Sequence, residues 1–98
     1  MHVHVSTATL AMSGLYARYH GRILQLARRS AADGAWRAKL REILAEFDDD
    51  CRTLPPTLNS ALRHELATQI EQEVLRFSDP DKRAVLTLAL KHVDAGAP

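Results

Sequence analysis

Residues 36–54 read WRAKLREILAEFDDDCRTL. Large apolar side chains recur in this stretch at steps of four or three residues, which places them in one narrow stripe along a helix. Such a stripe has to be covered by other helices to be kept from water. The stretch therefore predicts an amphipathic helix around which a helical bundle is organised. Its stripe consists of Trp36, Leu40, Ile43, Phe47, Cys51 and Leu54.

Three short breaks divide the remainder of the chain. A proline ends the helix before it and also fits the first turn of the helix that follows. An Asp at a break can cap the next helix. The breaks are Asp33-Gly34, Leu54-Pro55-Pro56 and Ser78-Asp79-Pro80. They predict helices from Ser6 or Thr7 to about Ala32, from the Asp33 cap through Leu54, from Thr57 or Ser60 to about Phe77, and from Pro80 to about Val93.

The chain of 98 residues makes one domain, and 46% apolar with 26% charged residues is an ordinary globular composition. Because the connections are short, we predict an all-α fold, a small antiparallel four-helix bundle in up-down-up-down order. Residues 1–5 are expected to form a flexible arm and residues 94–98 a frayed tail. Gly14 and Gly21 in the first helix either permit close helix contact or delay its firm start to about Leu15.

The Lys and Arg residues concentrate in the first half of the chain. Residues 1–41 carry seven of them and one acid, whereas residues 42–98 carry six of them and eleven acids. We favour the interpretation that the two halves attract each other when the helices pack. The run Asp48-Asp49-Asp50, which lies near a helix C-terminus where anions are unfavourable, is expected to meet the basic first helix. The alternative is a basic face for an acidic partner, formed by Arg18, Arg22 and Arg29.

The fourth helix is apolar over more than one stripe. A helix of this kind is deeply buried or binds a partner. We predict that Val85, Leu86, Leu90 and Val93 form a partner-binding surface, for a second copy of the chain in a homodimer or for another protein. The predicted function is a non-enzymatic protein-binding module, such as a chaperone, adaptor or regulatory protein.

Other classes of function lack their motifs. There is no Gly-rich loop before a helix for phosphate, no zinc spacing of Cys and His, and no base marked beside the single cysteine, Cys51. We therefore predict no enzyme activity and no cofactor. No apolar run is long enough to span a bilayer, and no charged segment precedes the first helix as in a secretory signal. The expected location is the cytoplasm, without membrane association.

Two alternatives stay open. A nucleic-acid-associated regulator would use Arg18, Arg22, Arg28 and Arg29, but a net charge of +1 and a Pro-Pro turn before Arg63 and His64 argue against a helix-turn-helix protein. A small metal-binding helical protein would use His2 and His4 or the run Asp48–Asp50. Neither set supplies enough ligands for a metal site.

A family resemblance involves Tyr16 through Leu54, with an aromatic-led first helix, Ala27, the turn Gly34-Ala35-Trp36, Leu40, Cys51 and Leu54. This pattern resembles the small helical flagellar and type III export chaperones of the FliT kind, over about residues 15–77. The chain has Ala35 and Arg37 where that pattern tends to be acidic. The resemblance implies helical hairpins that bind secreted or regulatory proteins, with the last helix covering or forming the partner surface.

Overall fold

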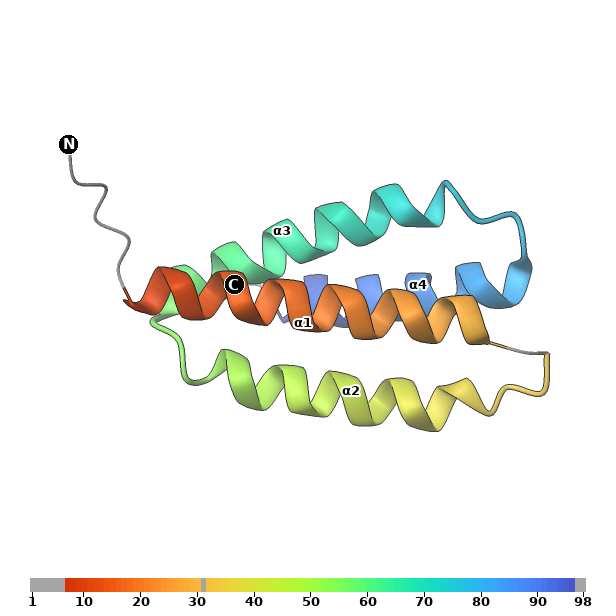
Figure 1. Cartoon of the computed structure of the whole chain (residues 1–98), viewed down its shortest axis with the longest axis horizontal. Coiled ribbons are helices and arrows are strands. Elements are labelled where there is room, and N and C mark those ends of the chain that lie inside the picture. The colour runs from red at the N-terminus through yellow and green to blue at the C-terminus, as the bar shows by residue number, and fades with distance from the viewer. Residues whose placement is uncertain (1–6, 31, 97–98) are drawn as a thin grey trace.

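The computed structural model describes residues 7–30 and 32–96. They form four helices: α1 (Thr7–Arg29), α2 (Trp36–Cys51), α3 (Pro56–Val74) and α4 (Pro80–Ala95) (Figure 1). The described residues contain no strand, so the all-α prediction is confirmed. The predicted arm and the last two residues of the predicted tail lie outside the described residues; α4 continues through Ala95, two residues beyond its expected end near Val93.

The four helices do not pack in the order in which they follow one another. Helices α1 and α4 each pack against the three other helices, whereas α2 and α3 barely touch each other. Figure 1 shows α2 and α3 on opposite sides of α1, with α4 behind it. The molecule measures 50 × 26 × 21 Å along its principal axes. Helices α1 and α4 therefore form the central pair, and α2 and α3 are the outer helices.

The helix ends follow the breaks with small shifts. The Asp79 carboxylate accepts the backbone N–H groups of Asp81 and Lys82, which is the predicted cap of α4. Helix α3 begins at Pro56 rather than at Thr57 or Ser60, because the fixed φ of proline suits the first position of a helix. Asp33 accepts the N–H of Ala35 and shapes the turn, so it does not cap α2 directly.

Helix α1 is regular from Thr7, so a firm start near Leu15 was a wrong expectation. A Cβ added at Gly14 or Gly21 would meet nothing within 4 Å. Neither glycine is therefore required for a close approach between helices.

The core contains every residue of the stripe predicted for residues 36–54, including Leu54 just beyond the end of α2. Tyr19 of α1 packs edge-on against Phe47, with ring centroids 5.2 Å apart. Trp36 is 5% exposed, as expected of an apolar anchor. Two charged residues of α3, Arg63 and Glu73, are also buried, and the sequence pattern predicted neither.

Candidate functional site

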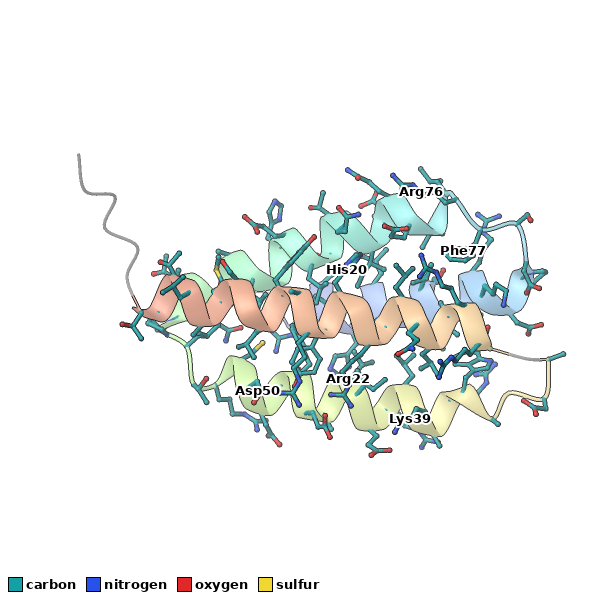
Figure 2. The ribbon with its side chains drawn as sticks, in the orientation of Figure 1. His20, Arg22, Lys39, Asp50, Arg76 and Phe77 are labelled. Carbon is teal, nitrogen blue, oxygen red and sulfur yellow. The ribbon has the colours of Figure 1, made fainter. Side chains whose placement is uncertain are left out.

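The basic first helix faces acids of α2. The Arg22 guanidinium donates to Glu46, and Nη1 of Arg18 lies 3.8 Å from Oδ2 of Asp50. The Tyr19 hydroxyl also donates to Asp50, and burial together with this hydrogen bond raises the Tyr19 pKa to about 12. Figure 2 shows Arg22 and Asp50 along the seam between α1 and α2. Arg18 and Arg22 are thus paired with acids within the chain. For these two residues, the interpretation that the basic and acidic halves attract each other holds.

Arg29, the third member of the predicted basic face, lies in a shallow hollow between α1 and α2. The hollow has a volume of about 250 Å³ and is also lined by Arg22 and Lys39. Arg22 is paired with Glu46, and Nζ of Lys39 lies 3.7 Å from Oε2 of Glu42. Much of the positive charge around this hollow is thus balanced by α2.

The predicted partner surface on α4 needs correction. Val85, Leu86 and Val93 are at most 1% exposed, because α4 packs against all three other helices. These side chains offer no surface to a partner while the bundle is closed. Leu90 is half-buried against the same core. The exposed large apolar residue of α4 is Leu88, whose exposed fraction is 41%.

A groove runs between α2 and α4 beside Leu88. It has a volume of about 380 Å³ and more apolar than polar surface. Its floor is formed by the edges of three buried α2 side chains, Trp36, Leu40 and Leu44. No acid lines the groove. Its lining residues are Trp36, Arg37, Leu40, Arg41, Leu44, Leu88 and His92.

Two arginines one helical turn apart stand along the α2 side of this groove. The guanidinium carbon of Arg37 lies 4.9 Å from the centroid of the Trp36 ring, a cation–π contact. Neither Arg37 nor Arg41 makes an ion pair with any residue in the described part of the chain. The buried indole Nε1 of Trp36 has no acceptor among these residues either. The groove thus combines apolar edges with cations that have no anionic partner.

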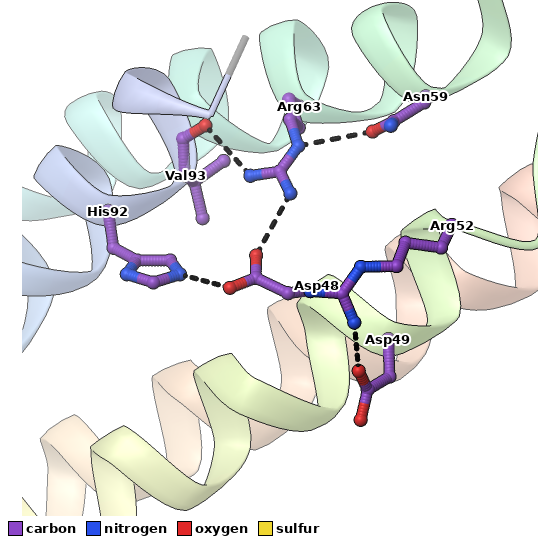
Figure 3. A network of polar contacts seen from close by, with 7 residues as sticks. All are labelled: Asp48, Asp49, Arg52, Asn59, Arg63, His92 and Val93. Carbon is purple, nitrogen blue, oxygen red and sulfur yellow. Dashed lines mark hydrogen bonds and ion pairs between the residues drawn. The ribbon is translucent and has the colours of Figure 1, made fainter. Parts of the chain in front are cut away.

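At its far end the groove meets a polar network that joins three helices (Figure 3). Nη2 of the buried Arg63 donates to Oδ1 of Asp48 at 2.9 Å, and Nε2 of His92 lies 2.8 Å from Oδ2 of the same carboxylate. Arg63 also donates to Asn59 at 3.1 Å and to the backbone carbonyl of Val93 at 3.4 Å. Every nitrogen of this guanidinium is engaged, so Arg63 is not free to contact DNA as a helix-turn-helix protein would require.

The network sets the charge of Asp48. Burial alone would raise the pKa of this carboxyl, but the hydrogen bonds from Arg63 and His92 outweigh burial and hold the pKa below its ordinary value. Asp48 is therefore an anion at neutral pH that links α2 to α3 and α4.

All three carboxylates of the run Asp48–Asp50 are paired with side chains of the same chain. Asp49 pairs with Arg52, and Asp50 is held by Tyr19 and Arg18, which confirms that part of the run meets the first helix. Residues 7–30 and 32–96 contain no group of three or more His, Cys, Asp or Glu side chains placed to hold a metal. His2 and His4 lie outside the described residues.

Cys51 has the features of a structural cysteine. It is fully buried, and burial raises the pKa of its thiol to about 11. A thiol of this kind is a weak nucleophile at neutral pH.

A buried acid lies between α1 and α3. Glu73 is 6% exposed and accepts from Gln69 at 2.9 Å, and Nε2 of His20 lies 3.7 Å from it, beyond hydrogen-bonding distance. His20 stacks on Tyr16 with ring centroids 5.8 Å apart. Neither His20 nor Glu73 lines the groove or the hollow beside Arg29, and we assign the two residues to a contact between α1 and α3.

No protein-family model, curated protein or solved structure matches the chain at a significant level. The resemblance to export chaperones therefore stays a prediction. None of the helices formed by the described residues is both long and apolar enough to cross a membrane.

Proposed function

We propose that the chain is a non-enzymatic protein-binding module, an antiparallel up-down-up-down bundle of the chaperone, adaptor or regulator type that binds its partner in the groove between α2 and α4. The groove carries this proposal. It joins the exposed Leu88 to the edges of Trp36, Leu40 and Leu44, and apolar grooves between helices are where proteins commonly accept a helical segment.

The exposed apolar residues support this position for the site. Three large apolar side chains among the described residues are exposed: Leu10 at 61%, Leu75 at 81% and Leu88 at 41%. Leu10 and Leu75 line neither the groove nor the hollow beside Arg29, whereas Leu88 forms one wall of the groove. Isolated exposed leucines are common on protein surfaces, but one beside an apolar hollow favours a binding site.

The alternatives draw less support. Two of the four arginines that a nucleic-acid regulator would use, Arg18 and Arg22, are occupied by acids of α2. A homodimer through the groove would be isologous, so Arg37 and Arg41 of both copies would enter the same interface. Like charges brought together across an interface oppose association. The proposed partner is therefore a different protein.

The test is affinity capture of the tagged chain from a nuclease-treated lysate of its native cell, with the captured proteins identified by mass spectrometry. Leu88→Asp should abolish capture of a stoichiometric protein partner, because it puts a charge against the groove floor. Leu75→Asp is the control, since it makes the same change at an exposed leucine outside the groove. Equal capture by both variants, or capture of nucleic acid alone, would overturn the proposal.

A further inference from the structure

We propose that the occupant of the groove is an acidic amphipathic helix of the partner protein, with apolar residues facing the groove floor and carboxylates facing Arg37 and Arg41. This inference rests on the proposed function and specifies the chemistry of its partner. It is carried by three observations: the length of the groove, its charge and the lack of a carboxylate paired with that charge among residues 7–30 and 32–96.

The floor has the dimensions of two to three turns of a helix. Trp36, Leu40 and Leu44 follow one another at steps of four residues, so they span about 12 Å along α2. A helix that binds through residues i, i+4 and i+7 presents anchors over about 10 Å, which is close to the length of this floor. Leu88 of α4 forms the opposite wall. A short helix laid along α2 could therefore place one apolar residue at each turn of the floor.

The rim of the groove selects for negative charge. Arg37, Arg41 and His92 line it, and no carboxylate does. No acid stands three or four residues from Arg41 in the sequence, so the helix itself offers that side chain no ion pair. By contrast, Arg18, Arg22, Arg52 and Arg63 each have a carboxylate within 4 Å.

Arg37 and Arg41 also repel each other. They are separated by four residues on one helix, an arrangement that places like charges side by side and destabilises the helix slightly. Carboxylates one turn apart on a bound helix have the spacing of these two arginines and would relieve that repulsion. The buried indole Nε1 of Trp36, next to Arg37 in the sequence, is a further donor without an acceptor among the described residues.

The charge and the apolar floor together favour a helix over other anions. Nucleic acid would be held by the cations but would leave Leu88 and the floor without an apolar partner. A second copy of the chain would bring its own arginines to the same interface, as argued above. An acidic amphipathic helix satisfies both features at once.

The experiment is a selection from a displayed library of amphipathic helices of about sixteen residues, a length at which isolated helices begin to be stable. Leu is fixed at i, i+4 and i+7, and the flanking positions vary among Glu, Gln, Ala and Lys. The library is selected on the full chain, on Leu88→Asp, on Arg37→Glu/Arg41→Glu and on Arg41→Glu alone. Circular dichroism establishes that each variant is folded, and Arg83→Glu on α4 is the control for a cation that does not line the groove.

We expect Glu to be enriched on the wild-type chain and on Arg83→Glu, and Lys to be enriched on Arg37→Glu/Arg41→Glu. A selected acidic peptide should bind the charge-reversed variant at least about tenfold more weakly. It should also change the emission of Trp36, the single tryptophan of the chain. Arg41→Glu, which breaks no hydrogen bond or ion pair within the described residues, should shift the selection in the same direction.

Other results separate the inference from the proposed function. Enrichment of neutral or basic helices that is lost in Leu88→Asp would overturn the acidic partner and leave the binding module standing. If no helix is enriched on the wild-type chain relative to Leu88→Asp, both proposals fail. A dimeric native mass abolished by Leu88→Asp, or a labelled DNA duplex whose binding needs Arg37 and Arg41, each found without helix enrichment, would assign the groove to those occupants instead.

Discussion

Replacement of Arg63 by Met should destabilise the protein strongly. The guanidinium is 7% exposed and joins α3 to Asp48 of α2 and to the backbone of α4. Because α2 and α3 have few close contacts, this ion pair is one of the few direct links between them. Met keeps a side chain of similar length and removes every donor.

The magnitude follows from the burial of the two partners. Removing one member of a fully buried ion pair costs about 3–5 kcal/mol. The Asp48 side chain is 28% exposed and keeps His92, so water and the imidazole offset part of the loss. The carbonyl of Val93 loses a long hydrogen bond, which adds up to about 1 kcal/mol. We expect a total loss of about 2–4 kcal/mol in the free energy of unfolding.

Urea unfolding at neutral pH measures this loss, in a double-mutant cycle with Asp48→Asn. The coupling energy should be about 1–3 kcal/mol, since the two side chains are in direct contact. Arg52→Met with Asp49→Asn forms the control cycle, because those side chains are 74% and 73% exposed and should couple by less than about 0.5 kcal/mol. A coupling for Arg63 and Asp48 no larger than that of the control cycle would refute the reasoning.

The same network predicts an acid-dependent loss of stability. Because the pKa of Asp48 is lower in the folded chain than its ordinary value of about 3.9, the stabilisation is complete above that value. It is lost as the pH falls from there through the lowered pKa. The slope of unfolding free energy against pH in this acid range should therefore be smaller in Asp48→Asn than in the wild-type chain, and equal slopes would contradict the argument.

Three further predictions concern single positions. Gly21→Ala should raise the free energy of unfolding by up to about 1 kcal/mol, because Ala favours the helix and the added Cβ meets open space; an unchanged or lower urea midpoint would contradict this. Cys51 should react with a thiol reagent at neutral pH only when the chain unfolds, because its thiol is buried and has a pKa of about 11. Rapid labelling of the folded chain would contradict this. Gly96→Ala should cost about 1–2 kcal/mol in thermal unfolding, because its Cβ would lie 2.6 Å from Cζ of Arg63. That cost should vanish in an Arg63→Met background, so equal losses in both backgrounds would exclude this clash.

The helical periodicity of residues 36–54 predicted the core side of α2 because the contacts within a helix depend on spacing alone. Each of its six stripe residues is buried, and the Asp79 cap of α4 was equally local. The stripe did not include Leu44, which is also buried and lines the groove. Leu44 follows Ile43 directly, so it lies beside the stripe, and only the position of α4 decides that this side of α2 is covered too.

The wide apolar surface of α4 shows where such reasoning ends. The sequence offered deep burial or a partner, and we predicted a partner. Burial explains Val85, Leu86 and Val93, because α4 belongs to the central pair of helices. Which helix is central depends on contacts between distant segments, and the short connections of this chain are compatible with more than one packing order.

The buried charges of α3 were missed for a similar reason. Lys, Arg and Glu are mostly exposed in proteins, so residue type alone does not predict that Arg63 and Glu73 are buried. Arg63 can be buried because its N–H groups donate hydrogen bonds to Asp48, Asn59 and the carbonyl of Val93. The signal in the sequence was the run of three acids near the end of α2, an unfavourable position that required cations from elsewhere in the fold.

The contacts of α2 divide it into two halves with different consequences. Its C-terminal half holds Glu46, Asp48 and Asp50, through which the other helices bind it by ion pairs and hydrogen bonds. Its N-terminal half holds Arg37 and Arg41, which have no such partner among residues 7–30 and 32–96. The charges that hold α2 to the other helices and the charges proposed for recognition therefore belong to different residues of one helix. Arg63→Met should lower the urea midpoint and leave the affinity for a selected acidic helix within about twofold. Arg41→Glu should lower that affinity and leave the urea midpoint unchanged. If both variants changed both quantities in proportion, the groove would be coupled to the network through His92, the one side chain that belongs to both.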